Sequence, residues 1–178
     1  GGIAAYKAAE LVRLLTKSAA DIQVVMTQSA KSFITPLTMQ ALSGRKVRDS
    51  LLDIEAEAAM GHIELARWAD VIVVAPASAN FMAELAHGGA KDLLSTLCLA
   101  SDAPIILCPA MNQLMWANTA TQNNIETLLK RHVTMVGPDV GEQACGDNGL
   151  GRMSEPTAIY DALAALFDEG LLKGVSVL

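Results

Sequence analysis

The sequence has few aromatic residues and no excess of basic side chains, and each of these shortages excludes a class of protein. Aromatic residues make up only 4% of the 178 residues, so a core must be built from aliphatic side chains and from the eight methionines. The formal net charge of −6 argues against nucleic acid or an anionic membrane surface as the main partner. No uninterrupted apolar run approaches the roughly 20 residues of a membrane-spanning helix, and no signal peptide is visible.

Cysteine is also scarce, and its pattern limits the chemistry of the chain. Cys98, Cys108 and Cys145 form no CxxC pair, and an odd count suits a reducing compartment. The three cysteines and three histidines lack the paired spacing of zinc ligands. We therefore expect a cytoplasmic protein without a metal site. Cys98 and Cys108 lie in apolar segments, where we expect them to be buried as small apolar side chains.

Apolar residues, by contrast, are abundant and follow a regular pattern. They make up 52% of the chain, which is enough for one domain with a sizeable core. The apolar run between Asp70 and Pro76 suits a strand buried on both faces, and residues 103–112 and 132–141 repeat this unit. Because helical patterns alternate with these strands, we expect an α/β fold of the Rossmann-like, flavodoxin-like type. Its parallel sheet would be flanked by helices on both faces.

The remaining elements are expected from the same patterns. A helix within residues 29–44 should be interrupted near Pro36 and should stop at Gly44. Residues 45–60 are expected to form a mixed connection. The patterns do not determine the order of the strands. We expect one further strand at residues 21–27, and helices at residues 4–18, 80–86, 91–101, 112–131 and 156–170.

Both ends of the sequence look cut. Gly1 and Gly2 stand directly before a helical pattern with no strand in front, and residues 173–178 (KGVSVL) resemble the first residues of a new strand. We therefore expect a fragment of a longer protein whose first strand is missing. Its main domain would cover residues 1–173, and residues 174–178 would begin a following domain or a linker.

The expected sheet also suggests where a ligand binds. In open α/β sheets, ligands bind outside the carboxyl ends of the strands. Here those ends carry loops rich in small and amide side chains. We expect these loops to converge on one site at the same edge of the sheet. They comprise residues 27–29, 76–80, 109–112 and 137–139.

The glycines at the start of the chain favour a mononucleotide over a dinucleotide. Gly1 and Gly2 before a helix could let backbone N–H groups approach a phosphate, although the pair alone is better explained as an ordinary turn. A dinucleotide site requires GxGxxG and an acidic residue after the second strand, where this chain has Thr27. The chain also lacks a GxxxxGK[ST] loop, so a ligand with one phosphate fits better than NAD or ATP.

Three polar side chains in these segments are candidates for chemistry, and each also has a structural explanation. Ser78 offers a hydroxyl beside Asn80, but capping the next helix is the commoner role for such a serine. Asn112 can both donate and accept hydrogen bonds. A lone histidine such as His62 is usually a structural hydrogen-bonding residue, and we assign His87 and His132 to that class.

Cys145 lies in an unusual setting, among glycines. A thiol with a pKa of roughly 8.5 is mostly protonated at neutral pH, so it can act as an acid or as a nucleophile. An incidental surface cysteine explains the position equally well. The neighbouring glycines would give the backbone freedom that a closing lid needs. They are Gly141, Gly146, Gly149 and Gly151.

Four segments together resemble the homo-oligomeric flavin-containing cysteine decarboxylases, and within that family the phosphopantothenoylcysteine decarboxylases. They are GGIAAYK (1–7), GHIELARWADVIVVAPASAN (61–80), PAMNQLMW (109–116) and QACGDNGLGRM (143–153). The resemblance covers nearly the whole chain and also accounts for its ends. It implies a first strand before Gly1 and a ligase domain that starts near residue 174.

The resemblance implies bound FMN and a role for each of several residues. His62 would be the active-site base, Asn112 would hold the substrate carboxylate, and Cys145 on a substrate clamp would donate a proton. The FMN would be held by Gly1, Gly2, Ile3, Thr27, Phe33, Pro76, Ala77, Ser78, Asn80 and Met111. The remaining clamp residues would be Ala144, Gly146, Asp147, Arg152 and Met153.

The implied reaction is the FMN-dependent decarboxylation of 4′-phosphopantothenoyl-L-cysteine to 4′-phosphopantetheine in coenzyme A biosynthesis. The cysteine thiol would be oxidised to a thioaldehyde, CO₂ would leave, and the resulting enethiol would be reduced again. Members of this family form trimers that assemble further into dodecamers, with the flavin between neighbouring subunits. We expect no nucleic-acid or membrane partner.

Other functions share parts of these motifs. A peptidyl-cysteine decarboxylase of lantibiotic maturation stops at the enethiol, and the ACGD setting of Cys145 favours the enzyme that completes the reduction. A flavin prenyltransferase is disfavoured by the combination of PAMNQLMW and ACGD. A non-catalytic FMN-binding regulatory subunit would carry an acidic tail that this sequence does not contain. A small-ligand binding module becomes the preferred alternative if FMN is absent.

Overall fold

The computed structural model describes residues 1–51, 60–143, 146–167 and 172–178. Within these ranges, five parallel strands follow one another in the order β1-β7-β2-β3-β4. This arrangement confirms the expected parallel sheet. The strands are β1 (Asp21–Ile22), β7 (Ser176–Val177), β2 (Ile72–Ala77), β3 (Ile105–Pro109) and β4 (Thr134–Met135).

The last residues of the chain lie inside this sheet. A parallel bridge between Val71 and Val177 joins the β1-β7 pair to the other three strands. Leu178 extends the join, because its carbonyl accepts a hydrogen bond from Val73 N (2.7 Å) and its N–H donates to Val71 O (3.0 Å). The domain boundary expected before residue 174 stays a prediction. In the structure, β7 is part of the sheet, between β1 and β2.

The sheet contains a gap beyond Leu178. There β2 continues to Ala77, and on the other side the chain continues past β1 through residues 23–27. A cavity of about 120 Å³ lies in this gap. On its outer edge, the segment of residues 23–27 contacts the chain at Arg48, because Met26 N donates to Arg48 O (2.8 Å). On its inner edge, residues 24–27 face the cavity and have no neighbouring strand among the described residues. The strand expected over residues 21–27 is therefore assigned only to Asp21–Ile22, where β7 supplies the partner.

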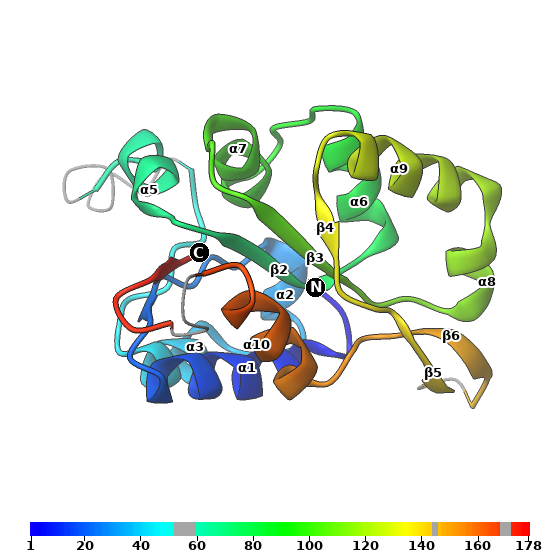
Figure 1. Ribbon diagram of the computed structural model, residues 1–178, viewed down its shortest axis with the longest axis horizontal. Helices are drawn as coiled ribbons and strands as arrows, with labels where there is room; N and C mark the ends of the chain where they lie inside the picture. The colour runs from blue at the N-terminus through cyan, green and yellow to red at the C-terminus, as the bar shows by residue number, and fades with distance from the viewer. Residues whose placement is uncertain (52–59, 144–145, 168–171) are drawn as a thin grey trace.

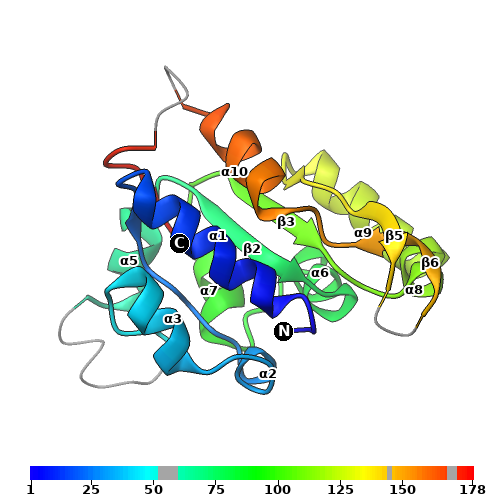
Figure 2. The same cartoon turned by 90° about the horizontal axis from the view of Figure 1, so that it is seen from below.

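Helices cover both faces of the sheet, as expected (Figure 1). Along β2, Val73 packs against the core on the α1 side, whereas Ile72 and Val74 pack against the core on the α7 side. Ile72 is fully buried, and such burial contributes about 1.5–3 kcal/mol. One face carries α1 (Ala5–Lys17), α3 (Pro36–Ser43) and α10 (Pro156–Ala164), seen in front in Figure 2; the other carries α5 (His62–Trp68), α6 (Ala79–Ala86), α7 (Leu93–Ala100) and α9 (Thr119–Lys130).

Two expected helices are shorter in the structure. The helix expected over residues 112–131 is two helices, α8 (Gln113–Ala117) and α9, because Asn118 has an extended backbone and caps α9 by accepting from Ala120 N (2.9 Å). The helix expected to reach residue 170 ends as α10 at Ala164, and residues 168–171 lie outside the described ranges. The break near Pro36 is confirmed, since α2 (Gln28–Lys31) precedes α3, and Gly44 ends α3 in a left-handed conformation.

The strand expected within residues 132–141 ends before its proline, as the repeated unit predicts, and β4 covers only Thr134–Met135. After β4 the chain turns at Gly137, whose φ is +84°, and Pro138 has no N–H to continue the parallel ladder. The chain then forms an antiparallel hairpin from β5 (Asp139–Glu142) and β6 (Asn148–Arg152), called the arm from here on. The arm projects from the edge of the molecule beside α8 (Figure 1). Residues 144–145 lie outside the described ranges, as do residues 52–59 of the connection expected at 45–60.

None of the helices within the described ranges is long and apolar enough to cross a lipid bilayer.

Candidate active site

Two cavities meet at the turn formed by residues 1–3. The first is the cavity of about 120 Å³ in the sheet gap, lined by Gly1, Thr27 and Pro76. The second has a volume of about 590 Å³ and lies between α1, the loop after β3 and the arm. Five residues predicted for the site line this second cavity: Ile3, Met111, Asn112, Arg152 and Met153.

The turn before α1 has the features of an anion site. No side chain caps α1, and its first turn carries no acidic residue, so no side-chain charge offsets the positive end of the helix dipole there. Gly1 lies so close to α2 that a Cβ atom there would overlap Ala30 N and Ser29 C. Thr27 caps α2 by accepting from Ala30 N (3.2 Å). A helix N-terminus that no side chain caps can bind a phosphate group.

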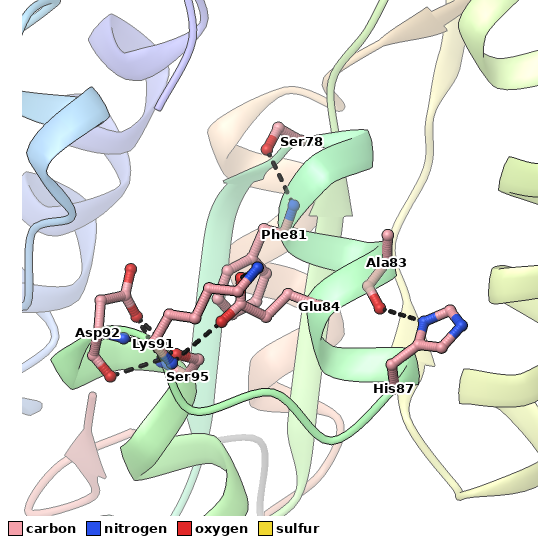
Figure 3. A network of polar contacts seen from close by, with 8 residues as sticks. All are labelled: Ser78, Phe81, Ala83, Glu84, His87, Lys91, Asp92 and Ser95. Carbon is pink, nitrogen blue, oxygen red and sulfur yellow. Dashed lines mark hydrogen bonds and ion pairs between the residues drawn. The ribbon is translucent and has the colours of Figure 1, made fainter.

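The loop after β2 is fixed mainly by helix capping. Ser78 Oγ accepts a hydrogen bond from Phe81 N (3.3 Å), so the capping role considered for this serine is confirmed (Figure 3). Ala77 is fully buried in the core, and its carbonyl accepts a hydrogen bond from Ala110 N (3.0 Å). Asn80 is exposed on α6, and Phe33 is 51% exposed just after α2. The cofactor contacts predicted for these residues stay predictions.

Asn112 is held in a defined orientation in the wall of the second cavity. Its Oδ1 accepts from Leu114 N (2.8 Å), which caps α8 and leaves the amide nitrogen directed elsewhere. Nδ2 donates to Asp147 Oδ2 at 3.0 Å. The amide of Asn112 is therefore placed to bind a carboxylate, and in this chain it binds the one on the arm.

The glycines of the arm allow close packing. Met111 N donates to Gly151 O (2.9 Å), and a Cβ at Gly151 would overlap Met111 O. A Cβ at Gly149 would likewise overlap Gln113 Oε1. Gly149 is thus paired with Gly141 in the hairpin, and Gly151 packs against the loop after β3; the lid expected from these glycines stays a prediction. Gly146 does lie in an open turn, with φ +85° and nothing within 4 Å.

The other clamp residues differ in how they are placed. Met153 is buried in the core, and Arg152 Nη2 forms an ion pair with Glu155 Oε1 (2.8 Å). Ala144 and Cys145 fall between the two strands of the arm and lie outside the described ranges. The proton-donor role of Cys145 stays a prediction.

The sequence patterns did not identify Lys7, which also lines the second cavity. Lys7 is only 2% exposed, and its Nζ donates to Met153 O (2.7 Å) and to Glu155 Oε1 (2.9 Å). The hydrogen bond from Lys7 lowers the pKa of the Glu155 carboxyl. The signal in the sequence was a charged residue on the apolar face of α1, four positions before Leu11.

Two cysteines and one histidine have the structural roles expected for them. Burial raises the pKa of the Cys98 and Cys108 thiols to about 12. His87 Nδ1 lies 2.7 Å from Ala83 O at the end of α6 (Figure 3). Within the described ranges, no group of three or more His, Cys, Asp or Glu side chains could hold a metal ion.

His62 is not brought together with Asn112 in a single chain. It is the first residue of α5, whereas Asn112 is the N-cap of α8. These two helices lie towards opposite ends of the molecule in both Figure 1 and Figure 2.

Known proteins similar to this chain include bifunctional enzymes. The coenzyme A biosynthesis bifunctional protein CoaBC of Haemophilus influenzae is 57% identical over 178 residues, which cover 99% of this chain and 44% of that protein. CoaBC of Bacillus subtilis is 43% identical over 169 residues, which cover 95% and 42%. The chain thus spans less than half the length of these relatives.

Solved structures with the same fold include a PPC decarboxylase mutant complexed with pantothenoylaminoethenethiol. It matches with a TM-score of 0.80 at 33% identity and covers 93% of both chains. The FMN binding protein AtHal3 matches with a TM-score of 0.78 at 33% identity, over 94% of this chain and 92% of that one. A family model described as Flavoprotein matches residues 1–168. Taken together with the parallel sheet and the glycine turn before α1, these matches show that the chain belongs to the flavoprotein family.

Proposed function

We propose that this chain catalyses the FMN-dependent decarboxylation of 4′-phosphopantothenoyl-L-cysteine to 4′-phosphopantetheine in coenzyme A biosynthesis. The observation that carries this proposal is the Asn112 amide, which binds a carboxylate in the wall of a cavity of about 590 Å³. The identity of 57% to CoaBC and the match to PPC decarboxylase support the choice of substrate. We also propose that the full-length protein is cytoplasmic and carries a phosphopantothenate–cysteine ligase domain.

FMN would bind where the first cavity meets the turn of residues 1–3. The backbone N–H groups of Gly2 and Ile3 before α1 would hold its phosphate, which the lack of a side-chain cap on α1 supports. Thr27 and Pro76 would border it from the facing strand ends. Bound FMN supplies a two-electron acceptor for the cysteine CH₂–SH group, which makes loss of CO₂ from the neighbouring carbon possible.

The chain's own side chains would bind, orient and protonate the substrate. Asn112 Nδ2 would donate to the substrate carboxylate and hold it out of the plane of the double bond that forms when CO₂ leaves. His62 would accept or hold the proton of the thiol. Cys145 would return a proton to carbon at the end of the reaction, while the arm keeps water away from the intermediate.

A complete site would require two copies of the chain. His62 and Asn112 belong to helices at opposite ends of the molecule, so a neighbouring copy would supply one of them. Large apolar side chains also stay exposed at the start of the chain, on α8 and on the arm, which supports a contact with another protein surface there. These are Ile3, Tyr6, Leu114, Met115 and Val140. We propose a trimer that assembles further into a dodecamer.

The cofactor and the reaction are tested together on the full-length protein. We expect flavin absorption bands at about one FMN per chain, and conversion of the substrate to CO₂ and 4′-phosphopantetheine with no added oxidant or reductant. A colourless protein that takes up no FMN would refute the proposal. If the product remains an enethiol, the chain is instead a decarboxylase that omits the final reduction.

The two-copy site is tested by mixing inactive variants. His62→Asn and Asn112→Asp should each abolish turnover while FMN stays bound, since Asn112→Asp keeps the oxygen that caps α8 and replaces the donor by a negatively charged oxygen that repels a carboxylate. Co-expression of the two should restore activity, with about a quarter of the sites native because each site draws its residues from two randomly combined subunits. FMN-loaded mixtures without activity would show that both residues serve the same copy's site.

A further inference from the structure

Lys7 is an unusual residue for its place in the fold. It lies on the apolar face of α1, is 2% exposed, and neighbours core residues such as Leu11. A buried ammonium group costs several kcal/mol unless it is paired and hydrogen-bonded, so its partners must offset that cost. The site and mechanism described above assign Lys7 no role.

The partners of Lys7 stand at the base of the arm. Its Nζ donates to Met153 O at 2.7 Å and to Glu155 Oε1 at 2.9 Å. Met153 follows directly after β6, and Glu155 is the N-cap residue of α10. The lysine therefore connects α1 to the point where the arm rejoins the body of the domain.

The contacts continue from Glu155 into both strands of the arm. Glu155 Oε1 also accepts from Arg152 Nη2 (2.8 Å), and the Arg152 side chain lies across β5, where a Cβ at Gly141 would be 2.9 Å from its Cδ. Beside these contacts, Ser154 Oγ donates a hydrogen bond to Asp139 Oδ1 (2.9 Å). The base of the arm is thus held by charged and polar groups whose buried anchor is Lys7.

The position of the arm determines the shape of the second cavity. Its strand β6 bonds to the loop after β3 through Gly151 O, and Asp147 reaches Asn112. Lys7 itself lines that cavity, about one helical turn after residues 1–3. A shift at the base of the arm would therefore move the cavity wall relative to the turn before α1.

We propose that Lys7 is a positioning residue for the decarboxylation: through Met153 and Glu155 it holds the arm at the distance from α1 that the substrate requires. This inference rests on the proposed function. Lys7 touches no reacting atom in it, and its effect is on substrate binding, because the arm forms one wall of the cavity and not the anion site at residues 1–3.

The test compares Lys7→Met with the matched control Lys17→Met, which removes an exposed lysine from the end of the same helix. In FMN-loaded full-length enzyme, Lys7→Met should raise the KM for 4′-phosphopantothenoylcysteine about tenfold, which corresponds to about 1.4 kcal/mol. The FMN content per chain should be unchanged, and kcat should fall less than KM rises. Lys17→Met should match the wild type in all three.

A second variant keeps the proposal testable if Lys7→Met folds poorly. Glu155→Gln changes only a half-exposed partner, and it should raise KM in the same direction by a smaller factor. In the double variant the two effects should not multiply, since both residues act through one contact. Multiplicative effects, or a loss of kcat and FMN with KM unchanged, would overturn the positioning role. A wild-type enzyme without activity would refute the proposed function instead.

Discussion

Replacing Gly151 by alanine should be more harmful than any other single methyl addition to the arm. Gly151 has a φ of +148°, a region that only glycine adopts readily, and this costs about 1–3 kcal/mol for another residue. The added Cβ would also overlap the backbone oxygen of Met111, which cannot move aside like the end of a flexible side chain. Separation of the two segments would break the Met111 N to Gly151 O hydrogen bond, a further 0.5–1.5 kcal/mol, roughly.

The expected total for Gly151→Ala is therefore about 2–4 kcal/mol of lost unfolding free energy. The matched control is Gly44→Ala, because Gly44 has a φ of +74° but nothing within 4 Å of its Cβ position. The control variant should lose only the free energy of placing an alanine in the left-handed conformation, about 1–2 kcal/mol. Urea unfolding followed by circular dichroism measures both, and amide hydrogen exchange at Met111 reports whether the loss is local to the arm. Equal losses in the two variants, with Met111 still protected, would refute the steric argument.

Three further predictions concern thiols, capping and pH. Iodoacetamide at pH 8 should leave Cys98 and Cys108 unmodified until the protein unfolds, because burial raises the pKa of both thiols to about 12; mass spectrometry checks this. Asp92→Ala should cost about 0.5–2 kcal/mol in thermal unfolding, since Asp92 closes a capping box on α7 (Figure 3). The hydrogen bond from Lys7 lowers the pKa of Glu155 in the folded state, so the ionised carboxylate stabilises the fold at neutral pH, and this contribution is lost as the pH falls through the folded-state pKa. Glu155→Gln should therefore make the unfolding free energy fall less steeply between neutral and acidic pH, as measured by urea unfolding at several pH values.

The helices were largely predictable because local spacing determines them. The apolar positions Leu11, Val12 and Leu15 identified α1, and Gly44 marked the end of α3. Strand length was less predictable, since a strand is defined by its partner. Residues 23–27 have the composition of a strand, but only Asp21–Ile22 pairs with β7.

The arm and the Lys7 contacts could not be derived from local patterns. The arm is rich in glycine, which suggests movement, whereas Gly151 in β6 brings its backbone against the backbone of Met111. The partner of Lys7, Glu155, lies 148 residues further along the chain. A charged residue on the apolar face of a helix indicates that a polar partner exists, but only the folded structure shows which residue that partner is. Asn112, in contrast, was found from its motif and does line a cavity.

The turn of residues 1–3 borders both cavities, and this shared wall has a thermodynamic consequence. Gly1 contributes to the first cavity and Ile3 to the second, so occupancy of either one constrains the same three residues. Linkage makes this coupling reciprocal. If a ligand in the first cavity changes the affinity of the second cavity for its ligand by some factor, the second ligand changes the affinity of the first cavity by the same factor. A substrate that strengthens the binding of FMN would accordingly be bound more tightly itself when FMN is present.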